Sequence, residues 1–364
     1  MPTLNTEARR QKDAQGGRPP RVPLARLLPF VSALLVSACS EPPMQVAQLV
    51  GQTMGTSYSI KLSPAPDEKR RAALQRQVEQ RLQTINRQMS TYQDDSDLTR
   101  FNLARSTDWQ PLPGAVVELV EQANRISRLT DGRYDVTVGP LVNLWGFGNS
   151  GSRDRPPSDK EIVTLLAQVG FRNLHSRRNP PALRKMVAEL QVDLSSIAKG
   201  WAVDQIAELL LAQGFENFLV EIGGELRAQG QKSASEPWRI AIEQPSFDSR
   251  IVQRVFELHD MAMATSGDYR NFFAADGQVY SHTIDPRTGQ PVQDRLASVT
   301  VLAENCAEAD AWATALMSLG ERQAPVLADR LDLKALFIVR TVAGLREQRS
   351  RTLADSRLWP AQAH

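Results

Sequence analysis

Apolar residues recur every three or four positions in three stretches of the chain, a spacing that places them on one face of an α-helix. These stretches cover residues 116–129, 162–169 and 203–210. Ser158 and Glu161 precede the second stretch with the spacing of a helix-capping box. The sequence therefore predicts three amphipathic helices, each with one buried face.

Short runs rich in β-branched and aromatic residues lie among and after these helices, as is typical of strands. Strands and helices do not alternate regularly, which favours an α+β domain over a doubly wound parallel sheet. No repeat or low-complexity linker interrupts residues 51–345, so we expect a single domain there. The predicted strands are Phe218–Ile222, Trp238–Ile242, Val252–Leu258, Ser298–Leu302 and Ala335–Val339.

The N-terminal segment has a different pattern. Residues 1–38 carry six basic and two acidic side chains and end in a short apolar run that contains Pro29. This pattern is typical of a secretory signal, and the apolar run is too short to cross a bilayer as a helix. The four residues that end at Cys39 (Val-Ser-Ala-Cys) resemble the lipobox of bacterial lipoproteins. We therefore expect a signal peptide at 1–38 and a lipid on Cys39, which would anchor the protein on the periplasmic face of the inner or outer membrane.

Two further segments flank the predicted domain. Residues 39–50 include two consecutive prolines and are expected to form a tether. Residues 346–364 are polar, and we expect a loose C-terminal tail there.

Charge and cysteine content exclude some classes of function. The net charge of +2 comes from the N-terminal segment, since the chain after residue 38 has 37 basic and 39 acidic residues. A nearly neutral body without a basic stripe predicts no nucleic-acid binding. Cys306 is the only cysteine after Cys39 and has no Cys or His at metal-ligand spacing, so we expect a small buried residue.

Polar residues concentrate in residues 264–271 and 280–289, which have the composition of loops that hold a functional site. His282 lies in the second of these segments, whereas the other three histidines have no nearby polar cluster. A polar hairpin with solvated turns is the alternative interpretation.

The alanine-rich segment that follows, residues 307–320, is predicted to be a helix closed by Gly320. Asp310 and Thr314 are four positions apart and share a face of that helix. A carboxylate and a hydroxyl among small residues suit Mg²⁺, which takes few carboxylates together with water and phosphate oxygens. A tightly packed helix with a structural aspartate is the alternative.

A segment of small residues, 193–200, includes Lys199 and leads from a strand-like run at 189–192 into a predicted helix near Trp201. Backbone N–H groups and one cation in such a turn are suited to binding a phosphate. This motif alone is not specific.

Two other motif matches are less favoured. The G-x-G-x-x-G pattern at 146–151 is not followed by a helix start, so it does not indicate a dinucleotide-binding fold. S-x-x-K at 196–199, Y-x-N at 269–271 and an R-T-G sequence at 287–289 follow the order found in penicillin-recognising serine acyltransferases. Pro286 favours a turn where that class needs a strand, and only 15 residues separate Asn271 from Arg287.

Seven blocks of sequence, in order between residues 51 and 320, resemble the ApbE family. The resemblance implies an α+β domain related to the T-fold, with mixed sheets, packed helices and a flavin cleft. It also implies an FAD:protein FMN transferase. The blocks cover residues 51–56, 131–148, 193–200, 221–225, 264–271, 281–289 and 309–315.

The resemblance also implies roles for individual residues. His282 matches the family histidine proposed as the base. Magnesium ligands are implied at Asp310 and Thr314, with main-chain oxygens of Ser196 and Ala313. Ala313 stands where some members have Asp, which leaves the number of metal ions open. FAD contacts are implied at Met54, Tyr92, Arg133, Tyr134, Asp135, Asp193, Lys199 and Ile284.

Together these residues predict magnesium-dependent transfer of FMN from FAD to a threonine hydroxyl of an acceptor flavoprotein, with release of AMP. The resemblance implies acceptors among the subunits of sodium-pumping NADH:quinone oxidoreductase or Rnf-type complexes. Three alternatives stay open at this point: magnesium-dependent hydrolysis of FAD to FMN and AMP, flavin binding without turnover, and serine acyl transfer.

Overall fold

A computed structural model describes the chain from residue 45 onward. The described ranges are 45–148, 151, 153, 155–245, 251–268, 272–275 and 278–358. The predicted signal peptide and Cys39 lie outside the described residues, as does the Y-x-N match at 269–271. Among the residues that are described, no helix is long and apolar enough to cross a membrane.

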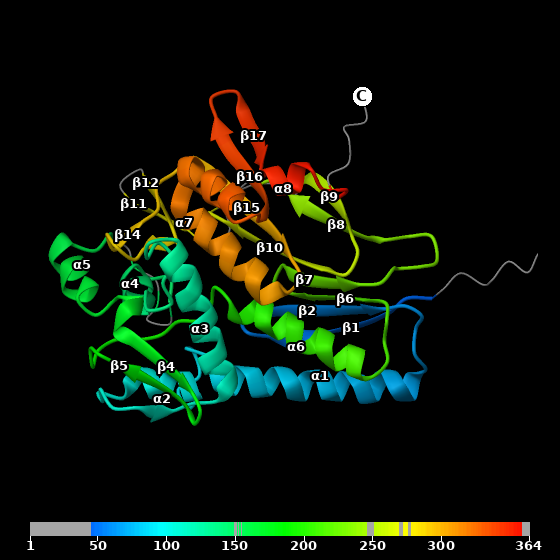
Figure 1. Cartoon of the computed structure of the whole chain (residues 1–364), viewed down its shortest axis with the longest axis horizontal. Helices are drawn as coiled ribbons and strands as arrows, with labels where there is room; N and C mark the ends of the chain where they lie inside the picture. The colour runs from blue at the N-terminus through cyan, green and yellow to red at the C-terminus, as the bar shows by residue number, and fades with distance from the viewer. Residues whose placement is uncertain are drawn as a thin grey trace, which may run out of the picture. The chain divides into compact units, whose positions relative to one another are not determined.

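An eight-stranded antiparallel sheet lies at the centre of the fold, in the order β1-β2-β6-β7-β10-β15-β16-β17 (Figure 1). Its strands are β1 (Ala47–Thr53), β2 (Thr56–Leu62), β6 (Phe218–Ile222), β7 (Glu225–Gln229), β10 (Met261–Gly267), β15 (Leu296–Ala303), β16 (Lys334–Thr341) and β17 (Gly344–Arg349).

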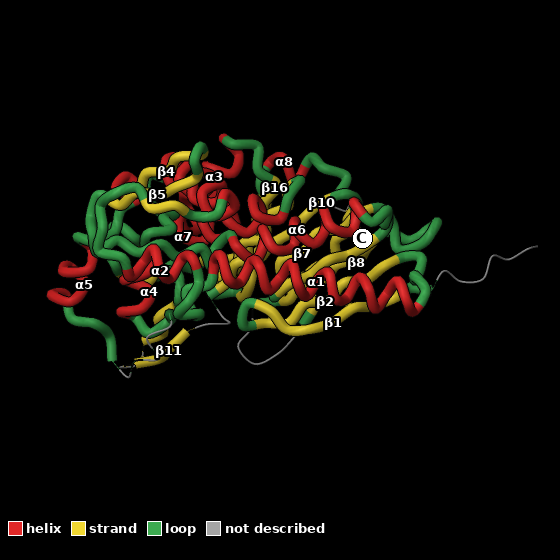
Figure 2. The backbone as a smooth tube through the Cα atoms, turned by 90° about the horizontal axis from the view of Figure 1, so that it is seen from below, coloured by secondary structure: helices red, strands yellow, loops and turns green. Residues whose placement is uncertain are grey.

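Helices cover one face of this sheet. Buried side chains of α1 (Glu68–Met89), α6 (Ala198–Ala212) and α7 (Cys306–Arg330) share one large core with inward residues of β2, β6 and β15, and α6 lies beside the strands in Figures 1 and 2. This core extends to α3 (Gly114–Leu129) and α2 (Asp97–Leu103).

The other face of the sheet is covered in part by the hairpin of β8 (Trp238–Glu243) and β9 (Val252–Leu258). A second apolar cluster, which includes Trp238 and Phe256, joins this hairpin to the sheet. A third cluster packs β13 (Ile284–Asp285) against α4 (Gly139–Leu144) and α5 (Asp159–Leu166). The remaining elements are β3 (Gln110–Pro111), β4 (Leu174–Arg178), β5 (Pro181–Lys185), β11 (Phe272–Ala275), β12 (Gln278–Ser281), β14 (Gln290–Pro291), α8 (Arg351–Ala354) and a 3₁₀ turn at Phe171–Asn173.

The predicted α+β class and the three amphipathic helices are confirmed. They correspond to α3, α5 and α6, and α5 begins with the predicted capping box. All five predicted strands are present as β6, β8, β9, β15 and β16. Periodicity predicted these elements well because each has one face buried in a core.

Two local predictions differ from the structure. The sheet extends past the predicted boundaries, because β1 starts within the expected tether and β17 pairs with β16 within the expected tail. Residues 189–192 form no strand, since the side chain of Asn102 pairs with both backbone groups of Val192.

The predicted helix end at Gly320 is confirmed. Gly320 has a φ of 75° and a ψ of 174°, which are not helical, so the first part of α7 ends there and a second helical part continues after the kink to Arg330.

Close contact between α6 and α7 fixes the position of the first turn of each helix. Gly200 lies so near α7 that a β-carbon there would be 2.3 Å from the Cys306 carbonyl oxygen and 2.8 Å from Ala307 Cα. The Asp204 carboxylate on α6 accepts hydrogen bonds from the backbone N–H groups of Cys306 and Ala307, each at 2.9 Å. An acidic side chain at a helix N-terminus satisfies otherwise unpaired donors.

Replacing Gly200 with alanine is therefore expected to destabilise the fold by about 1–3 kcal/mol, the usual cost of overpacking against a backbone. Urea unfolding of the purified protein measures this loss. Gly114→Ala in α3 is the matched control, since nothing lies within 4 Å of the β-carbon it adds. An equal effect of both substitutions, or none from Gly200→Ala, would argue against a tight helix contact.

Candidate functional site

A cavity of about 370 Å³ opens at the end of the sheet where β6 turns into β7 and β10 ends. It is lined by side chains from the loop after α1, the turn after α3, the first turn of α6, the β12–β13 loop and the N-terminal half of α7. Eleven of the residues predicted from sequence line this cavity: Tyr92, Arg133, Tyr134, Asp135, Asp193, Ser196, Lys199, His282, Ile284, Asp310 and Thr314.

One ammonium and two carboxylates form a buried cluster in the cavity. Lys199 Nζ lies 3.1 Å from Glu225 Oε1 and 3.7 Å from Asp310 Oδ1. Asp310 Oδ2 accepts a hydrogen bond of 3.0 Å from the backbone N–H of Gly200. The two carboxyl groups are buried and Lys199 is half-buried, and with both carboxyl groups ionised the cluster carries one more negative than positive charge.

The pKa values of these groups follow from burial and from their mutual distances. Burial alone would lower the pKa of Lys199, but the carboxylates of Asp310 and Glu225 raise it above its ordinary value. Burial raises the pKa of Glu225 to about 7, although the neighbouring ammonium opposes this. Burial also raises the pKa of Asp310, against the effect of Lys199. An added cation would favour the ionised form of both carboxyl groups.

This pairing argues against the serine acyltransferase alternative. In that class the lysine must accept a proton, whereas Lys199 is held protonated between two carboxylates. The Ser196 hydroxyl donates a hydrogen bond of 3.0 Å to the phenolic oxygen of Tyr134. Burial raises the pKa of Tyr134, so this phenol stays neutral and cannot act as a base in place of the lysine.

The donors present suit a hard divalent cation. Glu225 Oε2 is buried and has no hydrogen-bond partner among the described residues. Thr314, one helical turn after Asp310 on α7, exchanges a hydrogen bond of 3.1 Å with Ser266. No cluster of three His, Cys, Asp or Glu side chains at metal-binding distance occurs in the described ranges. The set of few carboxylates, hydroxyls and main-chain oxygens is nevertheless the kind that Mg²⁺ uses when phosphates complete its shell.

His282 is positioned by the packing of its loop. The indole Nε1 of Trp145 donates a hydrogen bond of 2.7 Å to the Gly289 carbonyl, which ties the turn between β13 and β14 to the end of α4. Ile284 is buried in the same apolar cluster as Trp145. The imidazole makes an edge-to-face contact with Phe147, with the ring centroids 6.3 Å apart. The loop therefore holds the imidazole at the rim of the cavity on an apolar support.

Arg133 and Asp135 also form ion pairs or hydrogen bonds with other residues of the protein. Arg133 Nη1 lies 3.4 Å from Asp285 Oδ2 and also donates to the Ser318 carbonyl. The Asp135 carboxylate accepts from the backbone N–H groups of Thr137 and Phe171, at 2.8 and 2.6 Å. Burial raises the pKa of Asp135. Asp135 therefore has a structural role in the turn after α3, whatever it contacts in a bound ligand.

Met54 and Ala313 do not line the cavity. Met54 and Gly55 form the two-residue turn between β1 and β2, both with positive φ, as a type I′ hairpin requires. The Met54 side chain packs against the main core. Ala313 is fully buried on α7, between Asp310 and Thr314 in sequence.

Glu225, Thr265 and Ser266 line the cavity but had no predicted role. All three lie in sequence blocks that resemble the family, but the resemblance gave these residues no role. The feature that could have identified them is a polar residue at the end of a strand, where side chains face the edge of the sheet rather than its core.

Tyr92 is 67% exposed at the rim of the cavity, which is unusual for a large aromatic side chain. Such a ring is available to stack on a planar aromatic ligand. Tyr92→Ala is expected to weaken FAD binding about three- to tenfold, the equivalent of one aromatic contact. Titration by flavin fluorescence measures this, with Tyr92→Phe expected to bind normally. Equal affinity of the alanine variant and the wild type would remove Tyr92 from the site.

Comparisons with known proteins show which family the chain resembles. The model of the ApbE family matches residues 54–337. The chain is 46% identical over 324 residues to an FAD:protein FMN transferase of Vibrio cholerae. The aligned residues cover 89% of this chain and 96% of that protein. It is 37% identical over 328 residues to an FAD:protein FMN transferase of Escherichia coli K12, with 88% and 93% covered.

Solved structures agree with this result. The flavin transferase ApbE from Vibrio cholerae superposes with a TM-score of 0.79 at 45% identity, covering 86% of this chain and 99% of that one. The apo form of the flavinyl transferase ApbE from Pseudomonas stutzeri superposes with a TM-score of 0.78 at 41% identity, with 85% and 96% covered. At this identity and coverage, the likeness extends over the whole described domain.

Proposed function

Because the chain belongs to the ApbE family and is an FAD:protein FMN transferase, we propose that it uses Mg²⁺ to move FMN from FAD onto a threonine hydroxyl of an acceptor protein. One observation carries the proposal. The carboxylate of Asp310, the hydroxyl of Thr314 and the imidazole of His282 line the same cavity, beside a cluster with an excess of negative charge.

The proposed reaction is a transfer at phosphorus. The acceptor oxygen forms a bond to the phosphorus of the FMN half, and the bond from that phosphorus to the bridging oxygen breaks. AMP leaves with the bridging oxygen, and the hydroxyl proton passes to His282. A positioned base of this kind contributes about 10²–10⁴-fold to the rate.

The remaining residues hold the substrate and compensate its charge. Asp310, Thr314 and the main-chain oxygens of Ser196 and Ala313 are the proposed holders of Mg²⁺, which would neutralise charge that develops on the phosphate oxygens. Lys199 remains protonated and adds a fixed positive charge on the same side of the cavity. Tyr92 lies at the rim, where it is available to a flavin ring.

The proposed location is the periplasmic face of a bacterial membrane, with a lipid on Cys39. Support comes from the basic and then apolar N-terminal pattern and the lipobox-like residues before Cys39. The proposed acceptors are flavin-carrying subunits of sodium-pumping NADH:quinone oxidoreductase or Rnf-type complexes.

The proposal is tested by incubating the purified protein with FAD, MgCl₂ and the flavin-accepting subunit of a sodium-pumping NADH:quinone oxidoreductase. Flavin fluorescence on the acceptor should survive denaturing electrophoresis, and excess EDTA should abolish it. An acceptor with valine in place of its threonine is the matched control. AMP and free FMN without labelled acceptor would indicate hydrolysis, and no AMP at all would indicate flavin binding without turnover. Either result would overturn the proposal.

A further inference from the structure

Glu225 is a buried carboxylate of the site for which neither spacing nor family resemblance gave a role. It is the first residue of β7, its side chain is 7% exposed, and it lines the same cavity as Lys199 and Asp310. Oε1 lies 3.1 Å from Lys199 Nζ, whereas Oε2 is buried without a hydrogen-bond partner in the described part of the chain. Burying a carboxylate with one unpaired oxygen costs folding free energy, which is typical of a functional rather than a structural group.

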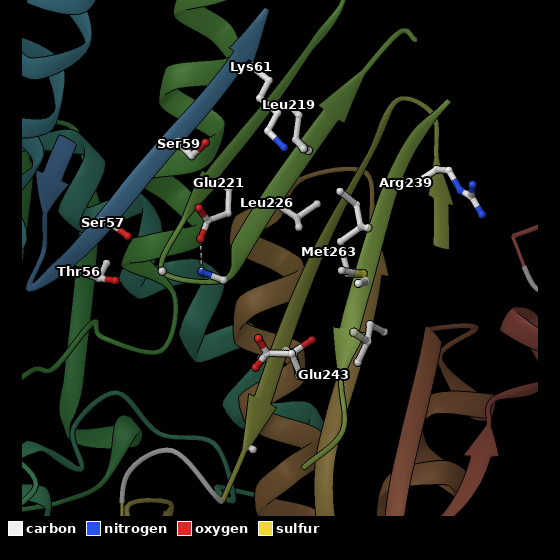
Figure 3. A pocket seen from close by; sticks show the side chains of 17 residues that line it. Thr56, Ser57, Ser59, Lys61, Leu219, Glu221, Leu226, Arg239, Glu243 and Met263 are labelled. Carbon is white, nitrogen blue, oxygen red and sulfur yellow. Dashed lines mark hydrogen bonds between the residues drawn. The ribbon is translucent and has the colours of Figure 1, made fainter. Parts of the chain in front are cut away.

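The turn between β6 and β7 determines where the Glu225 carboxylate lies. Gly223 and Gly224 form this turn with φ values of 64° and 107°, which glycine adopts at no steric cost. The Gly224 N–H donates a hydrogen bond of 2.7 Å to the Glu221 carboxylate. Figure 3 shows this bond, with Thr56 beside the turn. Glu225 therefore follows directly on a backbone that is held in place.

Close packing at Gly223 restrains the carboxylate further. A β-carbon at this position would lie 2.9 Å from Thr56 Cγ2 and 3.4 Å from both Glu225 Oε2 and Lys199 Cδ. The turn thus packs against the carboxylate on one side and against the aliphatic stem of the lysine on the other. The ammonium at the end of that stem is the adjustable group of the pair, because a lysine side chain rotates about several bonds.

The Lys199 ammonium lies between two carboxylates at unequal distances. Asp310 Oδ2 accepts a hydrogen bond of 3.0 Å from the Gly200 N–H, which leaves Oδ1 for another ligand. Lys199 Nζ is 3.7 Å from this Oδ1, which is longer than a hydrogen bond. Glu225 Oε1, at 3.1 Å, is the nearer partner. In the presence of Glu225, the ammonium therefore does not occupy the hydrogen-bonding position on Asp310 Oδ1.

Without the Glu225 carboxylate, Asp310 would be the remaining carboxylate beside the ammonium. Attraction between opposite charges is strong where water is scarce, and rotation at the end of the lysine side chain is sufficient to shorten the 3.7 Å distance. An ammonium bonded to Oδ1 would compete with a divalent cation for that oxygen and would repel the cation as well.

We propose that Glu225 is a positioning residue, whose carboxylate holds the Lys199 ammonium away from Asp310 Oδ1 and so keeps this oxygen available to the metal ion. The inference rests on the proposed function and deepens it, because it assigns control of metal affinity to a residue outside the proposed metal ligands. It differs from a direct ligand role for Glu225, in which loss of the carboxylate weakens metal binding whether or not Lys199 is present.

The test measures Mn²⁺ affinity from the EPR signal of free Mn²⁺, with each protein saturated with FAD and no acceptor present. Glu225→Asp keeps the charge but withdraws the carboxylate by one methylene, and Glu225→Gln keeps the shape but removes the charge. Each is expected to lower the affinity about tenfold or more, because the ammonium then competes for Asp310. Adding Lys199→Met to Glu225→Asp should restore the affinity to the wild-type value or above it.

Glu208→Asp is the matched control. Glu208 also joins α6 to β7, through an ion pair of 2.9 Å with Arg227, but it does not line the cavity. Its Mn²⁺ affinity should equal that of the wild type. A metal-free crystal structure of Glu225→Asp gives a direct view of the lysine, and Lys199 Nζ should lie within hydrogen-bond distance of Asp310 Oδ1.

Wild-type Mn²⁺ affinity in the folded Glu225→Asp and Glu225→Gln proteins would overturn the inference. A loss of affinity that Lys199→Met does not restore would also overturn it, because Glu225 would then hold the metal itself or support the fold. If the Mn²⁺ affinity of the wild-type protein does not fall after Asp310→Ala, the proposed function is overturned instead.

Discussion

Replacing Asp310 with alanine is expected to lower kcat for flavin transfer about a thousandfold. The carboxylate is the charged group among the four proposed metal holders, and a bound metal supplies several kcal/mol of stabilisation to a phosphoryl transition state. Its removal also leaves the Lys199 ammonium with Glu225 as its remaining partner, which makes the cluster less negative. Both effects are expected to lower the affinity of the site for Mg²⁺.

The measurement is the initial rate of acceptor labelling over a range of MgCl₂ concentrations. Asp310→Asn keeps the size of the side chain and should show a similar loss, since the charge is the feature that matters. Glu308→Ala is the control, because Glu308 lies on the same helix but pairs with Arg125 away from the cavity. If Asp310→Ala keeps a tenth or more of wild-type kcat, this residue does not hold the metal.

His282→Ala is expected to slow transfer about 10²–10⁴-fold, the contribution of a general base. Its affinity for FAD should change little, since the proposed role concerns the acceptor hydroxyl. Added imidazole should restore part of the rate, which a purely structural loss would not allow. The measurement is single-turnover labelling with saturating FAD.

His259→Ala serves as the matched histidine control, because His259 is exposed after β9 and does not line the cavity. Full activity of His282→Ala would rule out the base role. A loss that imidazole does not rescue, together with weaker FAD binding, would assign His282 to ligand binding instead.

Elements with a buried face could be predicted from sequence, and those held by other means could not. The helix α3 and the strand β6 follow from apolar spacing alone. β17 is an edge strand with mostly exposed or half-buried polar side chains, so its pairing with β16 leaves no hydrophobic pattern. Val192 is held by a single asparagine side chain from α2, a long-range contact that local propensity does not reveal.

The functional site, too, could be predicted only in part from the sequence. Spacing on one helix placed Asp310 next to Thr314, and local composition marked Lys199 and His282. The family resemblance then linked these distant segments to one site. Neither source marked Glu225 as the second carboxylate beside Lys199, because that contact depends on how β7 lies against the first turn of α6.

The proposed reaction depends on a divalent cation held by Asp310 and Thr314 in the cavity that His282 also lines. Crystals grown with FAD and Mn²⁺ in place of Mg²⁺ test this directly, because Mn²⁺ is visible by anomalous scattering. One strong anomalous peak is expected, in contact with the Asp310 carboxylate, the Thr314 hydroxyl and the FAD pyrophosphate. A peak bound elsewhere, or FAD bound with no peak near Asp310, would contradict it.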